Sequence, residues 1–290
     1  MITQDSLDTL LRKPDLLIVP GAYDALSARI AARAGAPAVY MSGFAVVGAS
    51  FGVPDLGLIG PDQMSERVRA MAGAIAPVPL IADGDNGHGG PANVARLVRA
   101  YEQAGAQCIQ IEDQVMPKRC GHMEGKEVVP LAEAVTKIRS AVAGRANRQF
   151  KIMARTDARS TDGLDEALRR GEAFLKAGAD ILFIEAPQSE AELEAVGQTF
   201  AGVPLVANMV EDGKTPVLPV AHLRQMGFRI VLYPISALLN VARRLETLYG
   251  ELLDGRGSGP QRDRFGFVEY NALVGLPEIL AFADRERQDD

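Results

Sequence analysis

The residues that first suggest chemistry are three carboxylates at the ends of two successive apolar runs. Asp83 and Asp85 close the run PLIADGD, and Glu112 lies near the end of the next run, CIQIED. Because side chains alternate along a strand, residues two apart share one side. Carboxyl groups that lie so close together raise each other's pKa unless a cation neutralises them. Asp-x-Asp alone is also typical of a solvated turn, but together with Glu112 these oxygen ligands predict a site for Mg²⁺, or Mn²⁺, rather than zinc.

A second stretch places a thiol beside several positive charges. Cys120 follows Lys118 and Arg119, and His122 comes two residues after it. Nearby cations lower the pKa of a thiol, which makes the sulfur a competent nucleophile or proton donor. An isolated loop cysteine can also be inert, but the charged neighbours disfavour simple burial. We therefore treat Cys120 as a candidate catalytic residue.

A repeating pattern of eight apolar runs supplies the elements that would position these residues. Each run is almost continuously apolar, as in parallel strands buried on both faces, and a helical pattern follows it. Beginning at Arg33, Gln103 and Lys176, the motif x-A-G-A places glycine where a helix ends in the left-handed conformation. Eight such alternations predict a (β/α)8 TIM barrel. The predicted strands are 16–20, 38–43, 79–85, 108–113, 151–158, 181–186, 204–210 and 229–234.

Polar residues fall where the predicted strands end. The carboxyl ends of barrel strands form the face that carries active sites, so we expect these residues to converge there. Arg155 and Asn208 are suited to holding a substrate carboxylate. Two long loops on that face, 44–60 and 114–130, are expected to serve as lids. The strand-end residues are Ser42, Asp83, Asp85, Glu112, Asp113, Arg155, Asp157, Glu185 and Asn208.

Composition excludes several classes of function. The net charge is −6 and basic residues are dispersed, so we expect no nucleic-acid partner. No apolar run approaches the roughly 18 residues of a membrane helix, so we expect no membrane partner either. There are two cysteines; Cys108, within an apolar run, is expected to be a core residue, and a cytoplasmic location fits so few thiols. We predict a single barrel domain over 1–290, with a flexible break at 255–260 and a helical arm at 261–290.

Five motifs together resemble the isocitrate lyase/phosphoenolpyruvate mutase superfamily. They are K-R-C-G-H at 118–122, D-x-D-x-G at 83–87, Y-M-S-G at 40–43, A-R-T-D-A at 154–158 and A-N-M at 207–209. The resemblance covers about 20–273, and the cysteine of the first motif is similar to the lyase branch. It implies a Mg²⁺-dependent barrel and a homotetramer, a dimer of dimers in which paired subunits exchange their last helices.

The resemblance also implies roles for individual residues. Cys120 matches the acid that protonates the carbanion-like product, and Tyr40 and Lys118 are candidates for helping to remove the hydroxyl proton. Glu185 matches a site carboxylate, and His122 belongs to the catalytic motif. The matched metal ligands are Asp85, which binds directly, and Asp83, Asp55 and Glu112, which bind directly or through water; the matched substrate contacts are Ser42, Gly43, Phe44, Cys120, Gly121, Arg155 and Asn208.

Three positions depart from the pattern of 2-methylisocitrate lyases. Met123 follows the motif histidine here, whereas 2-methylisocitrate lyases have a basic residue at that position. Leu239 and Tyr270 align with two arginines that hold the third carboxylate of that substrate. A tricarboxylate would then bury an unpaired charge, at a cost on the order of several kcal/mol. These departures favour a dicarboxylate, and the chain most resembles the group of 2,3-dimethylmalate lyase, the petal death protein and oxaloacetate hydrolase.

The resemblance therefore implies a Mg²⁺-dependent carbon–carbon lyase that cleaves a 2-hydroxy dicarboxylate, such as 2,3-dimethylmalate, to pyruvate and a carboxylate. Oxaloacetate hydrolysis to oxalate and acetate is the first alternative, although Pro234 resembles the lyases. Cleavage of 2-methylisocitrate stays open if Arg119 or another cation replaces the missing arginines. A non-catalytic binding barrel is disfavoured because Lys118, Cys120 and Arg155 are all present.

Overall fold

Eight parallel strands form the frame of the protein. The computed structural model describes residues 5–119, 121, 125–257, 259 and 264–288, and within them the strands pair in the order β6-β5-β4-β3-β2-β1-β8-β7. A parallel bridge between Leu182 and Leu205 links the two ends of that order, so the sheet is a nearly closed barrel. The predicted (β/α)8 barrel is confirmed. The strands are β1 (Leu17–Ala22), β2 (Val39–Met41), β3 (Leu80–Asp83), β4 (Cys108–Glu112), β5 (Lys151–Thr156), β6 (Ile181–Ile184), β7 (Val206–Asn208) and β8 (Ile230–Tyr233).

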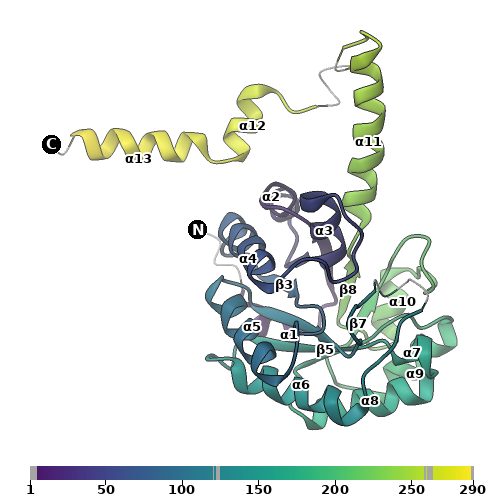
Figure 1. Ribbon diagram of the computed structural model, residues 1–290. Coiled ribbons are helices and arrows are strands. Elements are labelled where there is room, and N and C mark those ends of the chain that lie inside the picture. Colours follow the sequence, from purple (N-terminus) through teal and green to yellow (C-terminus); the bar gives the residue numbers. More distant parts are fainter. Residues whose placement is uncertain (1–4, 120, 122–124, 258, 260–263, 289–290) are drawn as a thin grey trace. The chain divides into compact units, whose positions relative to one another are not determined.

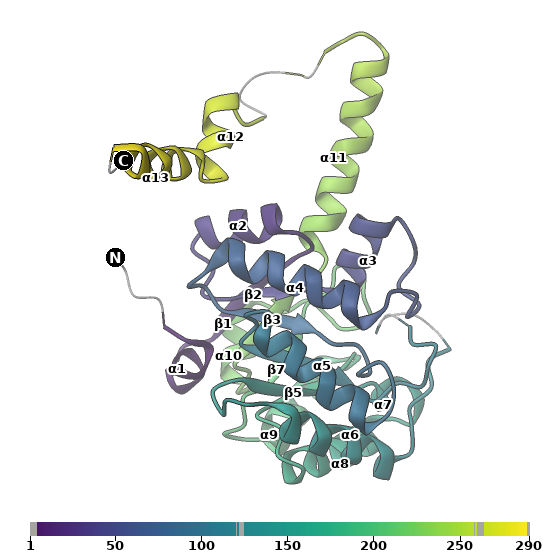
Figure 2. The same cartoon turned by 60° about the vertical axis from the view of Figure 1, so that its left-hand side comes forward.

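Helices alternate with these strands and surround the barrel (Figures 1 and 2). The predicted glycine joins are confirmed: Gly35, Gly105 and Gly178 follow three helix ends with φ of +92°, +99° and +101°. Glycine takes this conformation without a steric penalty, which is why the motif recurs. The helices of this part are α1 (Leu7–Arg12), α2 (Ala25–Arg33), α3 (Gly43–Phe51), α4 (Pro61–Ile75), α5 (Pro91–Gln103), α6 (Leu131–Gly144), α7 (Ala158–Thr161), α8 (Leu164–Lys176), α9 (Glu190–Thr199) and α10 (Val220–Gln225).

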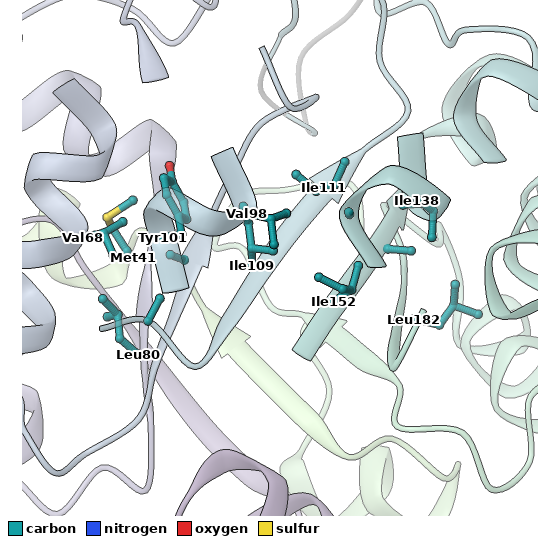
Figure 3. Packing of buried hydrophobic residues seen from close by; sticks show 14 of the residues in the cluster. Met41, Val68, Leu80, Val98, Tyr101, Ile109, Ile111, Ile138, Ile152 and Leu182 are labelled. Carbon is teal, nitrogen blue, oxygen red and sulfur yellow. The ribbon is translucent and has the colours of Figure 1, made fainter. Parts of the chain in front are cut away.

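Both faces of the strands are buried, which explains their continuous apolar runs. Side chains on the outer face join those of the helices in one cluster, where Ile109 of β4 and Val98 of α5 are both present (Figure 3). Side chains on the inner face form a second cluster inside the barrel. Cys108 belongs to this inner cluster and is fully buried, as the sequence predicts. The barrel is therefore a packed core whose strand ends are free to carry a site.

The loop predicted at 44–60 is partly wrong, because most of its first half is helix α3. Ser42 caps this helix, since its Oγ accepts a hydrogen bond from the Ala45 N–H at 3.4 Å. Gly52, with φ of +65°, ends it. The apolar sequence of α3 has no polar face, so its helical period is not visible in the sequence. The helix begins at the carboxyl end of β2 and turns its first N–H groups toward the strand ends.

The chain divides into two compact units, residues 1–238 and 239–290, with the boundary inside α11 (Ser236–Leu253). Helix α11 has no buried residue along its 18 positions. Beyond it, Gly255, Gly257 and Gly259 have positive φ, within the predicted break. The predicted helical arm contains α12 (Phe267–Leu273) and α13 (Leu276–Gln288). That the whole chain acts as one barrel domain with an arm stays a prediction. No helix of the described part of the chain has the length and apolar character needed to cross a bilayer.

Candidate active site at the carboxyl ends of the strands

A cavity opens at the carboxyl ends of the barrel strands. Most of the residues singled out from the sequence line it, and Gly43 and Asp85 adjoin it through contacts with lining residues. Cys120 and His122 lie outside the described residues. The lining residues are Tyr40, Ser42, Phe44, Asp55, Asp83, Glu112, Lys118, Arg119, Gly121, Arg155, Phe183, Glu185, Asn208, Val210, Leu232, Pro234 and Ile235.

One side of the cavity holds a buried cluster of carboxylates around a lysine. The Nζ of Lys118 lies 2.5 Å from Asp55 Oδ1 and 2.7 Å from Asp85 Oδ1, and none of the three side chains is more than 7% exposed. The Asp85 N–H donates to Asp83 Oδ1 at 3.0 Å, which fixes the two aspartates of the motif together. Lys118 therefore neutralises part of a cluster that brings together four predicted metal ligands from three parts of the chain.

Asp85 reaches this cluster by a different route from the one predicted. Strand β3 ends at Asp83, and Asp85 has φ of +50°, so the two do not share one side of a continuing strand. The period-two argument gave the right neighbours for the wrong reason. Gly84 makes the turn possible, because a Cβ there would lie 2.8 Å from the Gln110 carbonyl oxygen. Its N–H donates to that same oxygen at 2.9 Å, which holds the turn against β4.

The charges in this cluster are set by burial and by one another. Burial, reinforced by the neighbouring Asp85, raises the pKa of Asp83 to about 6. Burial also raises the pKa of Glu112 well above its usual value. Burial opposes the charge of Lys118, but the surrounding acids outweigh it and raise the lysine pKa well above its usual value. Lys118 is therefore a firmly protonated ammonium, and the carboxylates compete for too little positive charge.

The residues present fit a divalent cation. Glu112 Oε1 is buried and has no hydrogen-bond partner among the described residues. The donors at this end of the cavity are carboxylate oxygens, the set that Mg²⁺ and Mn²⁺ prefer. His88 Nε2 lies 3.5 Å from Asp85 Oδ2. A metal would be held by Asp85, Asp83, Asp55 and Glu112.

The opposite wall is built around Arg155 at the end of β5. Its guanidinium lies 3.2 Å from Glu112, 3.0 Å from Asp157 and 3.5 Å from Glu185, and it stacks 5.4 Å over the ring of Phe183. Asn208 Nδ2 donates to Glu185 Oε2 at 3.2 Å. Three acids therefore hold one arginine in a fixed orientation at the cavity wall. The predicted convergence of Arg155, Glu185 and Asn208 is observed.

Gln110 is a site residue that the sequence analysis missed. Tyr40 donates from its hydroxyl to Gln110 Oε1 at 3.0 Å, and Gln110 Nε2 donates to Asp83 Oδ1 at 3.1 Å. Burial raises the pKa of Tyr40 well above its usual value, so the phenol is a neutral donor here and a poor base. The signal was a single amide within the apolar run CIQIE, on the face that points into the barrel. Gln110 links the phenol to the carboxylate cluster.

Three residues that follow β4 in the chain, Lys118, Arg119 and Gly121, also line the cavity. The Arg119 N–H donates to Gln114 Oε1 at 2.9 Å, and Gln114 Nε2 returns a bond to the Arg119 carbonyl at 2.9 Å. Gly121 lies so close to the wall that a Cβ would be 2.5 Å from Arg155 Nη2. Only glycine fits at that position, which accounts for the G of the motif.

The remaining wall is apolar, and of its residues only Phe44 was predicted as a substrate contact. Apolar residues at strand ends look like core in a sequence, and nothing in the pattern separates the two. Leu239 and Tyr270 belong to the second unit, so the prediction drawn from them stays a prediction. A separate group of possible ligands, Glu190, Glu194 and His222, lies on α9 and α10 and does not line the cavity. The apolar lining residues are Phe44, Phe183, Val210, Leu232, Pro234 and Ile235.

Comparison with known proteins places this site in a family. The family described as phosphoenolpyruvate phosphomutase matches residues 7–253. The chain belongs to the phosphoenolpyruvate mutase/isocitrate lyase superfamily. It is 45% identical to 2,3-dimethylmalate lyase of Eubacterium barkeri over 280 residues, which cover 96% of each chain. It is 42% identical to 2-methylisocitrate lyase of Bacillus subtilis, covering 97% of this chain and 90% of that one.

Solved structures of related enzymes have the same fold as this chain. Oxaloacetate acetylhydrolase in complex with 3,3-difluorooxalacetate superimposes with a TM-score of 0.93 at 33% identity, covering 98% of this chain and 96% of that one. Phosphonopyruvate hydrolase in complex with oxalate and Mg²⁺ gives a TM-score of 0.86 at 31% identity, covering 98% and 99%. The family is metal-dependent, and its members named here include lyases. The expected membership, barrel and carbon–carbon lyase class are confirmed.

Proposed function

We propose that this protein is a Mg²⁺-dependent lyase that cleaves a substituted malate, such as 2,3-dimethylmalate, to pyruvate and a second carboxylate. One observation carries the proposal: a single cavity joins the buried acidic cluster of Asp55, Asp83 and Glu112 to an apolar wall. The acidic cluster suits a cation and the 2-hydroxy acid end of a substrate. The apolar wall suits the alkyl groups of the substrate. The likeness to 2,3-dimethylmalate lyase supports the same reaction.

Different residues of the cavity bind different parts of the substrate. The acidic cluster of Asp55, Asp83, Asp85 and Glu112 would hold a Mg²⁺ or Mn²⁺ ion, which would supply Lewis-acid polarisation of the 2-hydroxy acid end of the substrate. Arg155 and Asn208 hold a substrate carboxylate from the opposite wall, with Glu185 setting the orientation of both. Ser42 caps α3, and Gly43 and Phe44 begin it, so these three substrate-contact candidates lie at the end of a helix that favours negative charge. Gly121 lets the segment after β4 approach the substrate.

The proposed reaction assigns one step to each of the following groups. A base removes the proton of the 2-hydroxyl, the C2–C3 bond breaks, and its electron pair passes to C3 as a carboxylate-stabilised carbanion. Cys120 gives that carbon a proton, with His122 and Lys118 of the same motif beside it in the sequence. Tyr40 and Lys118 are the candidates for assisting this proton removal, although neither is a free base in this structure. Both carry their protons in this structure, because Tyr40 donates to Gln110 and Lys118 pairs with Asp85.

The apolar wall selects among related substrates. Burying one methyl or methylene group is worth about 0.8 kcal/mol, or roughly fourfold in binding. Oxaloacetate has no alkyl branch and gains nothing from Val210 or Ile235, which disfavours the hydrolase alternative. The lyase proposal therefore predicts a preference for alkylated malates.

A second candidate function has one observation in its favour. Arg119 lines the cavity and brings a positive charge that a third carboxylate would need. With Arg119 in that role, the protein would cleave 2-methylisocitrate, the reaction named for the relative from Bacillus subtilis.

The assembly that we propose is a homotetramer, a dimer of helix-exchanged dimers. Helix α11 has no buried residue, although Leu245 and Tyr249 lie along it with 39% and 56% exposure. On the barrel, Ile18 of β1 and Leu26 and Ile30 of α2 are 37–45% exposed, which is unusual for apolar side chains of these elements. Exchange of the arm between copies would bury such surfaces. We also propose a cytoplasmic location, and sedimentation equilibrium would test the tetramer.

The test of the proposed function is a comparison of kcat/KM for 2,3-dimethylmalate, 2-methylisocitrate and oxaloacetate, each with Mg²⁺ and with EDTA. The proposal expects the first substrate to be preferred and EDTA to abolish turnover. Preference for 2-methylisocitrate would replace it with the second candidate. Oxalate from oxaloacetate as the dominant product would make the protein a hydrolase.

A further inference from the structure

A buried lysine outside the predicted site joins the segment after β4 to the barrel. Lys126 Nζ lies 2.7 Å from Asp157 Oδ1 and also donates to the Gly121 carbonyl oxygen. The side chains of Lys126 and Asp157 are 1% and 0% exposed. One ammonium therefore links the backbone of Gly121 to a carboxylate fixed on the barrel.

Asp157 is a rigid anchor for that lysine. It directly follows β5, and its N–H donates to Asp113 Oδ1 at 2.9 Å. Asp113 in turn accepts from Arg170 Nη1 at 3.0 Å and from Thr156 Oγ1 at 2.7 Å. Burial opposes the charge of Asp157, but Arg155 and Lys126 outweigh it and hold its pKa below the usual value. The carboxylate that Lys126 meets is thus ionised and held from several directions.

The Gly121 carbonyl is a sensitive point at which to attach the segment. A Cβ at Gly121 would lie 2.5 Å from Arg155 Nη2 and 2.8 Å from Glu185 Cδ, so this peptide is in contact with the cavity wall. Any shift of the peptide changes the distance between the segment and those two groups. A buried ion pair is weak as a source of stability, because desolvation offsets its attraction. Here the ion pair instead fixes the position of the Gly121 peptide.

We propose that Lys126 is a positioning residue for the reaction: it ties the Gly121 carbonyl to Asp157 and so fixes Gly121 against Arg155 and Glu185. This inference rests on the proposed function for its kinetic test. A misplacement of about 1 Å at reacting groups can cost roughly 100-fold in rate. Apart from Gly121, the proposed substrate contacts lie on other elements of the barrel, so the loss should fall mainly on kcat.

Two variants and a matched control test this role. Lys126→Met removes the ammonium, and Lys126→Arg keeps a charge of similar reach. Lys151→Met is the control, since Lys151 is a nearly buried lysine at the opposite end of β5 and pairs with Asp8 at 2.5 Å. We expect Lys126→Met to lower kcat about 100-fold with KM changed less than about threefold. Lys126→Arg should recover at least about tenfold of that loss, and Lys151→Met should keep kcat near the wild-type value.

A second readout needs no turnover. Glu127 is exposed and adjoins Lys126, so cleavage after Glu127 by a glutamate-specific protease reports how firmly the segment is held. Cleavage should accelerate at least about tenfold in Lys126→Met and stay near the wild-type rate in Lys151→Met. If Lys126→Met does not fold, Lys126→Gln takes its place with the same expectations.

The two readouts separate the two proposals. A wild-type protein inactive on all three substrates would refute the proposed function, and protease cleavage would still decide the role of Lys126. Wild-type-like kcat in Lys126→Met, or unchanged cleavage after Glu127, would overturn the inference. So would equal losses in Lys126→Met and Lys151→Met, because they would show a general effect of removing a buried lysine.

Discussion

The central prediction concerns Lys118, the ammonium that lies among the candidate metal ligands. Lys118→Met removes the charge that meets Asp55 at 2.5 Å and Asp85 at 2.7 Å, and it leaves these buried carboxylates next to Asp83 and Glu112. Removing one partner from a buried ion pair typically costs about 3–5 kcal/mol. We therefore expect the variant in EDTA to lose about 3 kcal/mol or more of unfolding free energy.

A metal ion should reverse much of this loss. An ion that binds the folded state alone stabilises it by about 2.7 kcal/mol at a hundred times its Kd. Without Lys118 as a competitor, the carboxylates should bind Mg²⁺ more tightly than in the wild-type protein. Excess Mg²⁺ stabilises both proteins, and the difference between them shrinks by RT ln of the ratio of their Kd values; about 30-fold tighter binding by the variant would reduce it by about 2 kcal/mol, to about 1 kcal/mol.

Equilibrium urea unfolding of both proteins, at one protein concentration, in EDTA and in excess MgCl₂, measures the effect. Lys137→Met is the control, because Lys137 is buried on α6 and lies 4.0 Å from Glu133, outside the cavity lining. Its loss should be the same in both buffers. An equally large loss for Lys118→Met in both buffers would refute the assignment of these carboxylates as a cation site.

Three further predictions concern single residues. Cys120→Ser should abolish most turnover and leave Mg²⁺ binding by calorimetry intact; wild-type-like turnover would remove Cys120 from the mechanism. Asp85→Asn should lose metal-dependent activity and weaken Mg²⁺ binding at least about tenfold; unchanged binding would exclude it as a ligand. Glu192→Gln should cost about 1 kcal/mol of unfolding free energy at pH 7, because Arg159 donates to both Glu192 oxygens at 2.7 Å and holds its pKa below the usual value. A depressed carboxyl pKa stabilises the fold above the unfolded pKa, so this difference should vanish as the pH falls below about 4, and a difference that persists in acid would contradict it.

The barrel could be read from the sequence because its signals are local and repeated. A strand that is buried on both faces appears in the sequence as a continuous apolar run. Glycine recurs just after the helices because the residue that ends a helix often takes the left-handed conformation. Helix α3 was missed because its nine residues, GFAVVGASF, show no polar face. Element bounds shifted by one or two residues where polar strand-end residues continued the apparent runs.

The candidate site was predictable where its residues carry charge at strand ends. Asp83, Asp85 and Glu112 were grouped correctly, although a left-handed turn at Asp85, not strand alternation, brings them together. Gln110 and Lys126 were missed because their partners, Asp83 and Asp157, are distant in sequence. Such pairs depend on how strands close around the barrel, which no local pattern records.

The most direct measurement of the central claim is the cleavage of 2,3-dimethylmalate in D₂O with Mg²⁺, followed by NMR. The proposed lyase should give pyruvate and propionate in equal amounts, with one solvent deuterium at the carbon of propionate that carried the broken bond. Persistence of the substrate, or products other than this pair, would contradict it.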